Sequence, residues 1–334
     1  MSDSESSLSP LTPPASFFTP DSPTLTLAVI GAGAWGSTLA GLAAAGGHRV
    51  RVWSRRHGDR LQTVLDGADI VISAISMKGV RAVVEQVQAV GVNPHAIFVT
   101  ATKGLDPESD GETPLPLLPS QLWQAAFPTH PVVVLSGPNL SKEIQQGLPA
   151  ATVVASQTMA AAETVQMALS SASFRVYTNP DALGVELGGT LKNVIAIAVG
   201  TCDGLQLGTN AKAALVTRGL AEIIRVGSYW GAKPETFYGL SGLGDLLATC
   251  NSSLSRNYQV GYGLAQEKSL AEVLAHLEGT AEGINTTRVL IHLASQQDIA
   301  IPISHQVDRL LKGEITAQAA VEALMLRDYK AEVR

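Results

Sequence analysis

A glycine-rich turn near the start of the chain constrains the fold more than any other feature. Gly31, Gly33 and Gly36 have the spacing G-x-G-x-x-G, between an apolar run of strand length at 24–30 and an Ala- and Leu-rich helical stretch at 37–47. In this setting the first glycine permits a tight turn, the second lets the backbone approach a pyrophosphate, and the third lets helix and strand pack closely. The helix N-terminus then faces the phosphate charge. The motif therefore predicts a dinucleotide site, in preference to a glycine turn without a ligand.

The end of the second predicted strand, 49–53, bears on which dinucleotide is bound. An Asp or Glu there would bind the ribose 2′-hydroxyl of NAD. This chain instead has Arg55 and Arg56, with no acid before Asp59. Guanidinium groups match a phosphate, so the pair would tolerate or prefer NADP(H) and leaves NAD(H) open. The alternative is that both arginines are simply solvated at the surface.

Strand and helix patterns continue to alternate up to Pro180. Strands are expected at 68–75, 96–102, 132–136, 151–156 and 174–177, with helices at 79–90 and near 160–170. Ligands bind beyond the carboxyl ends of strands in open parallel sheets. Lys103 and the turn Gly137–Ser141 directly follow two of these strands, so we expect them to meet cofactor or substrate. Lys103 could equally be an ordinary surface lysine.

Beyond Pro180 the patterns are helical only, at 183–200, 209–229, 242–249, 257–265, 269–277, 285–297, 303–312 and 316–326. The predicted fold class is α/β: an N-terminal Rossmann-type doubly wound sheet followed by an all-α substrate domain. We place the dinucleotide-binding domain at 24–180 and the helical substrate and catalytic domain at 181–334. Residues 1–23 are Ser/Pro-rich and carry no Lys or Arg, which predicts a disordered tail without a targeting signal.

Composition excludes several classes of function. A net charge of −6 and a pI near 5.7 argue against a nucleic-acid binder, which needs a basic face. No apolar run reaches the length needed to cross a bilayer, so no membrane insertion is expected. The two cysteines, Cys202 and Cys250, give no disulfide framework and fit a reducing compartment. Neither His nor Cys shows metal-ligand spacing, so we predict no metal.

One cation stands out in the helical half. Lys192 lies in the middle of the apolar stretch 183–200, which has the character of a buried helix. A buried lysine costs desolvation energy unless it is paired or lines a pocket, and burial lowers its pKa so that it can exchange a proton near neutral pH. The alternative is that Lys192 reaches the surface along its own stem.

Two further stretches offer partners for this lysine or for an anion. Asp245 opens a helix among apolar neighbours; it either caps that helix or pairs with Lys192, and spacing does not decide between them. Ser255 has the character of an N-cap, followed by Arg256 and Asn257. A hydroxyl, a guanidinium and an amide beside free backbone N–H groups suit a substrate phosphate, although Ser255 could act only as a cap.

Taken together, these residues resemble the NAD(P)-dependent glycerol-3-phosphate dehydrogenases of bacteria. The resemblance is carried by GAGAWG, VWSRR, ATKGL, LSGPNLSKEI, the long string from Glu186 to Ile223, GLGDLLATC, SLSRN and EGINTTR, and covers roughly 25–303. It implies hydride transfer between C2 of sn-glycerol 3-phosphate or dihydroxyacetone phosphate and a nicotinamide, in a cytoplasmic enzyme that supplies glycerophospholipid synthesis. A homodimer is compatible with it. Another Rossmann-type 3-hydroxy-acid dehydrogenase and a non-catalytic NAD(P) sensor are the alternatives.

The resemblance also implies roles for individual positions. Lys192 would donate and accept the proton at the C2 oxygen, with Asp245 beside it. The substrate would be bound by Lys103, Gly137, Asn139, Lys192, Asn193, Asp245, Ser255, Arg256 and Asn257. The dinucleotide would be bound by Gly31, Gly33, Ala34, Trp35, Gly36, Arg55, Arg56, Lys103, Ser141, Arg256 and Glu282.

The chain departs from the family pattern at three places. The segment after the second strand is shorter than usual, running from Arg56 almost directly into the third strand. The third strand is followed by Ser76-Met77 where a Pro-Ser pair is usual, and Asn139 stands where Ser is usual. The shortening bears on cofactor selectivity, and none of the three removes a group assigned to proton transfer or phosphate binding.

Overall fold

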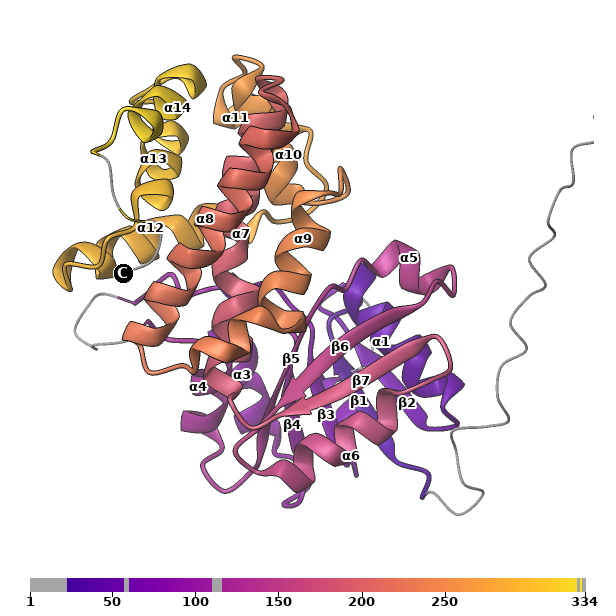
Figure 1. Ribbon diagram of the computed structural model, residues 1–334. Helices are drawn as coiled ribbons and strands as arrows, with labels where there is room; N and C mark the ends of the chain where they lie inside the picture. The colour runs from indigo at the N-terminus through magenta and orange to yellow at the C-terminus, as the bar shows by residue number, and fades with distance from the viewer. Residues whose placement is uncertain (1–22, 57–59, 110–115, 329–330, 332–334) are drawn as a thin grey trace, which may run out of the picture.

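The computed structural model describes residues 23–56, 60–109, 116–328 and 331. The tail predicted at 1–23 therefore lies outside the described residues, apart from Pro23. Figure 1 shows a sheet with flanking helices in one half of the molecule and a group of helices in the other. The long helix α7 (Ala182–Gly204) rises from the sheet into the helical half.

Seven strands form one sheet in the order β2-β1-β3-β4-β5-β6-β7. All neighbours are parallel except β5 and β6, which pair antiparallel, a reversal that the sequence patterns did not predict. The order reverses between β1 and β3, where open α/β sheets bind ligands beyond the strand ends. The strands are β1 (Thr26–Ile30), β2 (Arg49–Trp53), β3 (Ile70–Ser73), β4 (Ile97–Thr100), β5 (Val132–Ser136), β6 (Ala150–Ala155) and β7 (Phe174–Asn179).

Helices cover both faces of the sheet, as a doubly wound fold requires. Leu27 and Val29 of β1 face one hydrophobic core with α1 (Ala34–Ala45) and α6 (Met159–Leu169). Ala28 and Ile30 face the opposite core, because side chains alternate along a strand. That core is closed by α2 (Leu61–Leu65), α3 (Val80–Val90) and α4 (Pro119–Ala126). The short helices α2, α4 and α5 (Ser141–Gln145) were not predicted, and α1 begins earlier than expected, within the glycine turn.

The C-terminal half of the described chain contains only helices and turns. Its helices are α7, α8 (Gly208–Tyr229), α9 (Asp245–Cys250), α10 (Arg256–Ala265), α11 (Leu270–Ala275), α12 (Glu282–Gln296), α13 (Pro302–Leu311) and α14 (Ala317–Met325). A 3₁₀ turn (Pro234–Tyr238) and a π-helical turn (Leu240–Gly244) join α8 to α9. A further 3₁₀ turn, Met77–Gly79, follows β3. The helices α7 to α14 match the predicted helical stretches to within a few residues.

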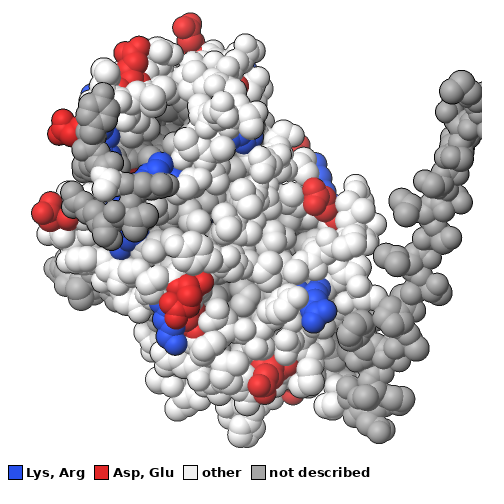
Figure 2. All heavy atoms as spheres, in the orientation of Figure 1, with Lys and Arg blue, Asp and Glu red and all other residues white. Residues whose placement is uncertain are grey.

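Helix α7 is the central element of the helical half. It packs against α8, α9, α10 and α12 and against β5 and β6, and most of its residues are buried. The expectation that no apolar run reaches the length needed to cross a bilayer is wrong for α7. Among the described helices it alone is long and apolar enough by length and composition, yet 83% of its apolar window is buried inside the protein. Its composition therefore reflects a place at the core of a globular domain. At the surface, Figure 2 shows acidic and basic side chains scattered among uncharged areas of the face in view.

Candidate active site

Lys192 is buried and paired. Its side chain projects from α7 with 6% of the residue exposed, and its Nζ lies 3.2 Å from Oδ1 of Asp245, which is 3% exposed. Asp245 does not cap α9, because the π-helical turn before it continues the helical path and its carboxylate is used by lysine. The pairing alternative is therefore confirmed for Asp245, and Lys192 does not extend to the surface.

A second lysine completes the charged group. Lys103 follows β4, and its Nζ lies 2.6 Å from Oδ2 of Asp245. The same ammonium donates a 3.0 Å hydrogen bond to the carbonyl of Gly137, the first residue after β5. Gly137 has φ +146, a backbone conformation that favours glycine. The ends of β4 and β5 thus meet α7 and α9, and one carboxylate lies between two ammonium groups.

This arrangement shifts the pKa of Lys192 downward. Burial is the main cause, because a low-dielectric surrounding disfavours the charged form, and the nearby Lys103 ammonium lowers the pKa further. Asp245 acts in the opposite direction and limits the decrease. A lowered pKa lets the Lys192 ammonium release its proton more readily than an ordinary lysine, which suits general acid–base catalysis.

Thr249 belongs to this group and was missed from the sequence. Its hydroxyl accepts a hydrogen bond from the Lys192 ammonium and lies 3.3 Å from Oδ1 of Asp245. The signal that could have found it is its spacing of four residues from Asp245, which places both on one face of α9.

The predicted anion-binding residues surround the start of α10. The Ser255 hydroxyl accepts a 3.3 Å hydrogen bond from the Tyr258 backbone N–H, so it does cap the helix. Asn257 is buried and donates to Oδ1 of Asn193, the residue after Lys192, at 2.9 Å. Arg256 is exposed and free to reach an anion in solvent. Asn257 therefore connects the start of α10 to α7 at the residue that follows Lys192.

Glu282 begins α12 beside this cluster. Its carboxylate accepts a 3.1 Å hydrogen bond from the backbone N–H of Met77, in the turn after β3. Burial raises the pKa of Glu282, while the Met77 N–H and the charge of Arg256 lower it. Glu282 thus lies between the predicted phosphate cluster and the sheet edge assigned to the cofactor.

The glycine turn fits a dinucleotide. Gly31 has φ +117, and a Cβ on Gly36 would lie 1.9 Å from the Gly31 carbonyl oxygen, so both positions require glycine. A Cβ on Gly33 would meet nothing within 4 Å, which leaves its backbone open to a ligand. No side chain caps the N-terminus of α1, so its N–H groups are available to a pyrophosphate.

The remaining predicted cofactor residues lie around this turn. The Gly31 N–H donates to the Trp53 carbonyl at 2.8 Å, which places the end of β2 beside the turn. Arg55 and Arg56 follow β2 and are exposed, with α2 soon after in the shortened connection. Ala34 and Trp35 open α1, with Trp35 half-buried, and Ser141 opens α5.

Asn139 is the predicted substrate residue that the structure places differently. Its amide nitrogen donates to the Thr152 hydroxyl of β6 at 3.1 Å rather than to the lysine group. Its buried Oδ1 has no hydrogen-bond partner among the described residues. A contact between Asn139 and substrate stays a prediction.

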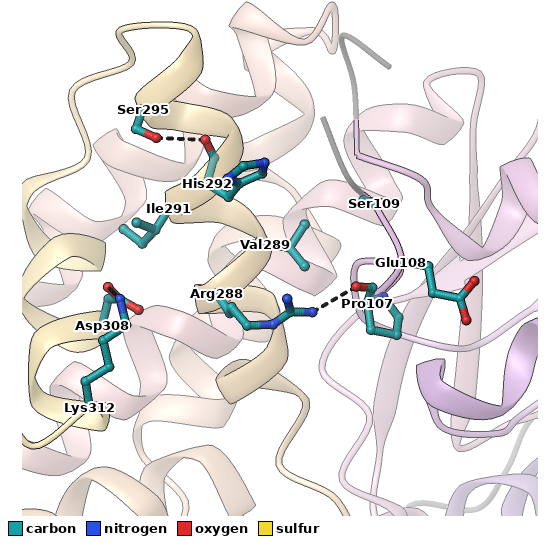
Figure 3. A pocket seen from close by; sticks show the side chains of 10 residues that line it. All are labelled: Pro107, Glu108, Ser109, Arg288, Val289, Ile291, His292, Ser295, Asp308 and Lys312. Atoms are coloured by element: carbon teal, nitrogen blue, oxygen red, sulfur yellow. Dashed lines mark hydrogen bonds and ion pairs between the residues drawn. The ribbon is translucent and has the colours of Figure 1, made fainter. Parts of the chain in front are cut away.

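A separate cavity of about 560 Å³ lies outside this site. Figure 3 shows it between the loop after β4 and the helices α12 and α13. None of the residues predicted to act on substrate or cofactor lines it. Its lining residues are Pro107, Glu108, Ser109, Arg288, Val289, Ile291, His292, Ser295, Asp308 and Lys312.

A dinucleotide turn at the reversal point of a parallel sheet, and a buried Lys–Asp–Lys group where that sheet meets a helical half, define a two-domain nicotinamide-dependent dehydrogenase. The comparisons with known proteins identify the family. The model for the C-terminus of NAD-dependent glycerol-3-phosphate dehydrogenase matches residues 181–322, and the model for its N-terminus matches 26–64 and 57–162. The chain belongs to this family.

Relatives agree along nearly the whole chain. A glycerol-3-phosphate dehydrogenase [NAD(P)+] of Nostoc sp. is 68% identical over 307 residues, covering 92% of this chain and 98% of the relative. The corresponding protein of Synechocystis sp. is 60% identical, covering 91% and 94%. The crystal structure of glycerol-3-phosphate dehydrogenase from Coxiella burnetii has a TM-score of 0.85 at 32% identity, covering 91% of this chain and 99% of that one.

The N-terminal family model matches in two pieces that overlap over residues 57–64. This is the connection after β2 that the sequence marked as shorter than usual.

Proposed function

We propose that this chain catalyses the NAD(P)-dependent interconversion of dihydroxyacetone phosphate and sn-glycerol 3-phosphate, with Lys192 as the proton donor and acceptor. The observation that carries the proposal is the buried group in which Asp245 lies between Lys192 and Lys103. Family membership supports the choice of substrate, because the relatives are named for it.

Lys192 would act at the C2 oxygen. When bound, the nicotinamide supplies the hydride in reduction and accepts it in oxidation. In the reductive direction the Lys192 ammonium protonates the oxygen as negative charge develops on it, and the lowered pKa of Lys192 assists that transfer. Asp245 and Thr249 hold the ammonium in place, and the positive charge of Lys103 stabilises the developing alkoxide.

The substrate phosphate would bind at the start of α10. Ser255, Arg256 and Asn257 are consecutive residues there, at the N-terminus of a helix of ten residues. Asn257 donates a hydrogen bond to Asn193, the residue after Lys192. Phosphate binding at Asn257 would therefore help to orient the substrate carbonyl toward Lys192. Binding energy from the remote phosphate would position C2 for reaction.

The glycine turn would hold the dinucleotide. Gly31, Gly33 and Gly36 would receive the pyrophosphate at the N-terminus of α1. Glu282 and Ser141 would border the cofactor from α12 and α5.

Replacing Lys192 tests the mechanism. In Lys192→Met, oxidation of NADPH with dihydroxyacetone phosphate should fall by at least about 100-fold, the usual contribution of a general acid. Cofactor binding, followed by quenching of protein fluorescence, should persist because Lys192 does not face the glycine turn. Unchanged turnover in a folded Lys192→Met protein would contradict the proposed mechanism. Activity of the wild-type chain on an unphosphorylated 3-hydroxy acid, and none on dihydroxyacetone phosphate, would contradict the proposed substrate.

Cofactor choice makes a second prediction. Because Arg55 and Arg56 are exposed beside the glycine turn and no acid replaces them, NADPH should be used at least as well as NADH. Steady-state kinetics with both cofactors check this, with Arg55→Ala/Arg56→Ala expected to raise the KM for NADPH and leave that for NADH nearly unchanged. A strong preference of the wild-type enzyme for NADH would overturn the assignment.

The physiological setting follows from the reaction. We infer a cytoplasmic enzyme whose product supplies glycerophospholipid synthesis, which agrees with two free, buried cysteines. The homodimer stays a prediction, and light scattering after size-exclusion chromatography measures it directly.

A further inference from the structure

Two polar side chains of α12 hold the loop that follows Lys103. The Asn285 amide donates a hydrogen bond to the Leu105 carbonyl at 2.8 Å. Nη2 of Arg288 donates a hydrogen bond to the Pro107 carbonyl at 2.8 Å, which Figure 3 shows as a dashed line. The same Arg288 nitrogen lies 3.2 Å from Oδ1 of Asn285, so the two form one connected pair. Their spacing of three residues places them on adjacent turns of one side of α12.

The same N-terminal part of α12 also touches the active site. The Gly283 N–H donates to Oδ1 of Asn257 at 2.9 Å. A Cβ on Gly283 would lie 2.8 Å from the backbone oxygen of Asn193, the neighbour of Lys192 in sequence. Helix α12 therefore has one end against α7 beside Lys192 and its polar side against the loop that begins two residues after Lys103.

That loop is also held from the sheet half. Asp106, 1% exposed, accepts a 2.8 Å hydrogen bond from Nε of Arg81 in α3. The loop thus has one set of contacts to its own domain and another to the helical half. Leu105 is fully buried in the hydrophobic core of the helical half, and the hydrogen bonds of Asn285 and Arg288 fix the loop backbone to α12, the helix that contacts Asn193 and Asn257 through Gly283.

We propose that Asn285 and Arg288 are positioning residues that keep Lys103 against Asp245. The inference rests on the proposed function of the lysine group. The Lys103 ammonium crosses from the end of β4 to α9, and its contacts there are Asp245 and the Gly137 carbonyl. The lysine side chain is long and flexible, so this ion pair forms only while the two halves of the protein keep their relative position. Interfaces between domains permit relative motion unless further contacts prevent it.

We call the side chains of Asn285 and Arg288 the clamp. Loss of the clamp should change the pKa of Lys192. The charged and titratable groups that influence Lys192 are Asp245 and Cys250 on α9 and Lys103 after β4. Lys103 lowers the pKa of Lys192, so moving Lys103 away raises that pKa. Oxidation of glycerol 3-phosphate needs neutral Lys192, so its rate should then rise at higher pH than in the wild type.

The variant Asn285→Ala/Arg288→Ala tests the inference in the full-length enzyme. We expect kcat to fall about tenfold, since small misplacements of a reacting group are costly, with the KM for NADPH unchanged. The pH at which oxidation reaches half its maximum should move upward. Arg288→Lys, which keeps a donor for the Pro107 carbonyl, should restore most of the loss in kcat relative to Arg288→Ala.

Arg225→Ala is the matched control. Arg225 is also an arginine whose exposed hydrogen bond goes to a carbonyl, that of Ala300 at 2.6 Å, but this contact lies wholly within the helical half. Arg225→Ala removes the same charge and the same kind of hydrogen bond as Arg288→Ala. It should leave kcat and the pH profile of oxidation unchanged. An equal effect in this control would overturn the assignment to Lys103.

A double-mutant cycle with Lys103→Ala separates positioning from general destabilisation. In the Lys103→Ala background the clamp substitutions should cause no further loss of the residual kcat. Losses that multiply in both backgrounds would show that the clamp does not act through Lys103. Should the double variant fail to fold, Arg288→Ala alone, at an exposed position, carries the same cycle. A wild-type enzyme inactive on dihydroxyacetone phosphate would instead refute the proposed function.

Discussion

At the scale of single residues, Asp245 determines the character of the site. Its Oδ1 lies 3.2 Å from Nζ of Lys192, and its Oδ2 lies 2.6 Å from Nζ of Lys103. Burying an ammonium without a counter-charge is costly, and this single carboxylate compensates two of them. With Lys192 protonated, the group therefore carries a net positive charge, which suits a site that receives negative charge during reduction.

Asp245→Asn removes that compensation while keeping the shape of the side chain. Because Asp245 raises the pKa of Lys192, its loss should lower that pKa further. Reduction of dihydroxyacetone phosphate needs protonated Lys192, so the reductive kcat should decline from a lower pH than in the wild type. Its maximum should drop by about 100-fold. Profiles of kcat between about pH 6 and pH 9 measure both changes.

Asp203→Asn is the control for this substitution. Asp203 pairs with Lys212 at 2.7 Å near the other end of α7, where both side chains are partly exposed. An ion pair of this kind contributes up to about 1 kcal/mol to stability, and the pH profile should not move. A profile of Asp245→Asn that overlays the wild type would contradict the assigned electrostatic role.

At the scale of elements, the crossing of α7 and α10 holds the anion-binding residues near Lys192. Figure 1 shows the two helices running side by side. A Cβ on Gly261 of α10 would lie 1.8 Å from the Ile197 carbonyl, and one on Gly200 of α7 would lie 2.1 Å from the Tyr258 carbonyl. The two backbones therefore approach more closely than any larger residues would allow. This approach brings Asn257 within reach of Asn193.

Gly261→Ala should disrupt this crossing. The added methyl group meets backbone, which cannot rotate away, so we expect a loss of about 3 kcal/mol in the free energy of unfolding. Gly41→Ala in α1 is the matched control, because its Cβ meets nothing within 4 Å. It should stabilise the protein by about 0.5–1 kcal/mol through helix propensity. Urea denaturation of both variants distinguishes the two outcomes, and a neutral Gly261→Ala would show that the helices can separate freely.

At the scale of the whole molecule, α7 joins the two halves through a buried acid. Glu186, 2% exposed, accepts a 2.9 Å hydrogen bond from the backbone N–H of Ser120 in α4 and another from the Ser120 hydroxyl. Burial raises the pKa of Glu186 to about 7, although these hydrogen bonds lower it. The helix that carries Lys192 is thus attached to the sheet half by a carboxyl group that titrates near neutral pH.

Stability should depend on pH through Glu186. The folded protein binds this proton more tightly than the unfolded chain, whose carboxyl has a pKa near 4.5. The contribution of Glu186 to the free energy of unfolding is therefore fully present below pH 4.5, falls as pH rises to about 7, and is lost above that pH. Glu186→Gln should remove this decrease, which is at most about 3.5 kcal/mol because the pKa rises from 4.5 to about 7 and one pKa unit corresponds to about 1.4 kcal/mol. Thermal melts across this range measure it, and the exposed Glu163→Gln should follow the wild type.

Much of the fold could be predicted because its signals are local. The glycine turn, the strand runs, the helical stretches after Pro180 and the cap at Ser255 are each written within a few consecutive residues. The antiparallel pairing of β5 with β6 could not be predicted in this way, because either direction satisfies the same buried run. The short helices α2, α4 and α5 carry too few periodic residues to be recognised.

By itself, the sequence determined that a lysine lies within an apolar helical stretch and that a dinucleotide turn precedes it. Only the tertiary structure decided which groups meet that lysine. Lys103 and Asp245 are 142 residues apart, and their contact depends on how the end of β4 meets α9. Thr249 belongs to the group because α9 presents one face to α7, where the Thr249 hydroxyl contacts Lys192. Burial and charge pairing are properties of neighbours in space, so the chemistry of Lys192 is defined only once distant segments have packed around it.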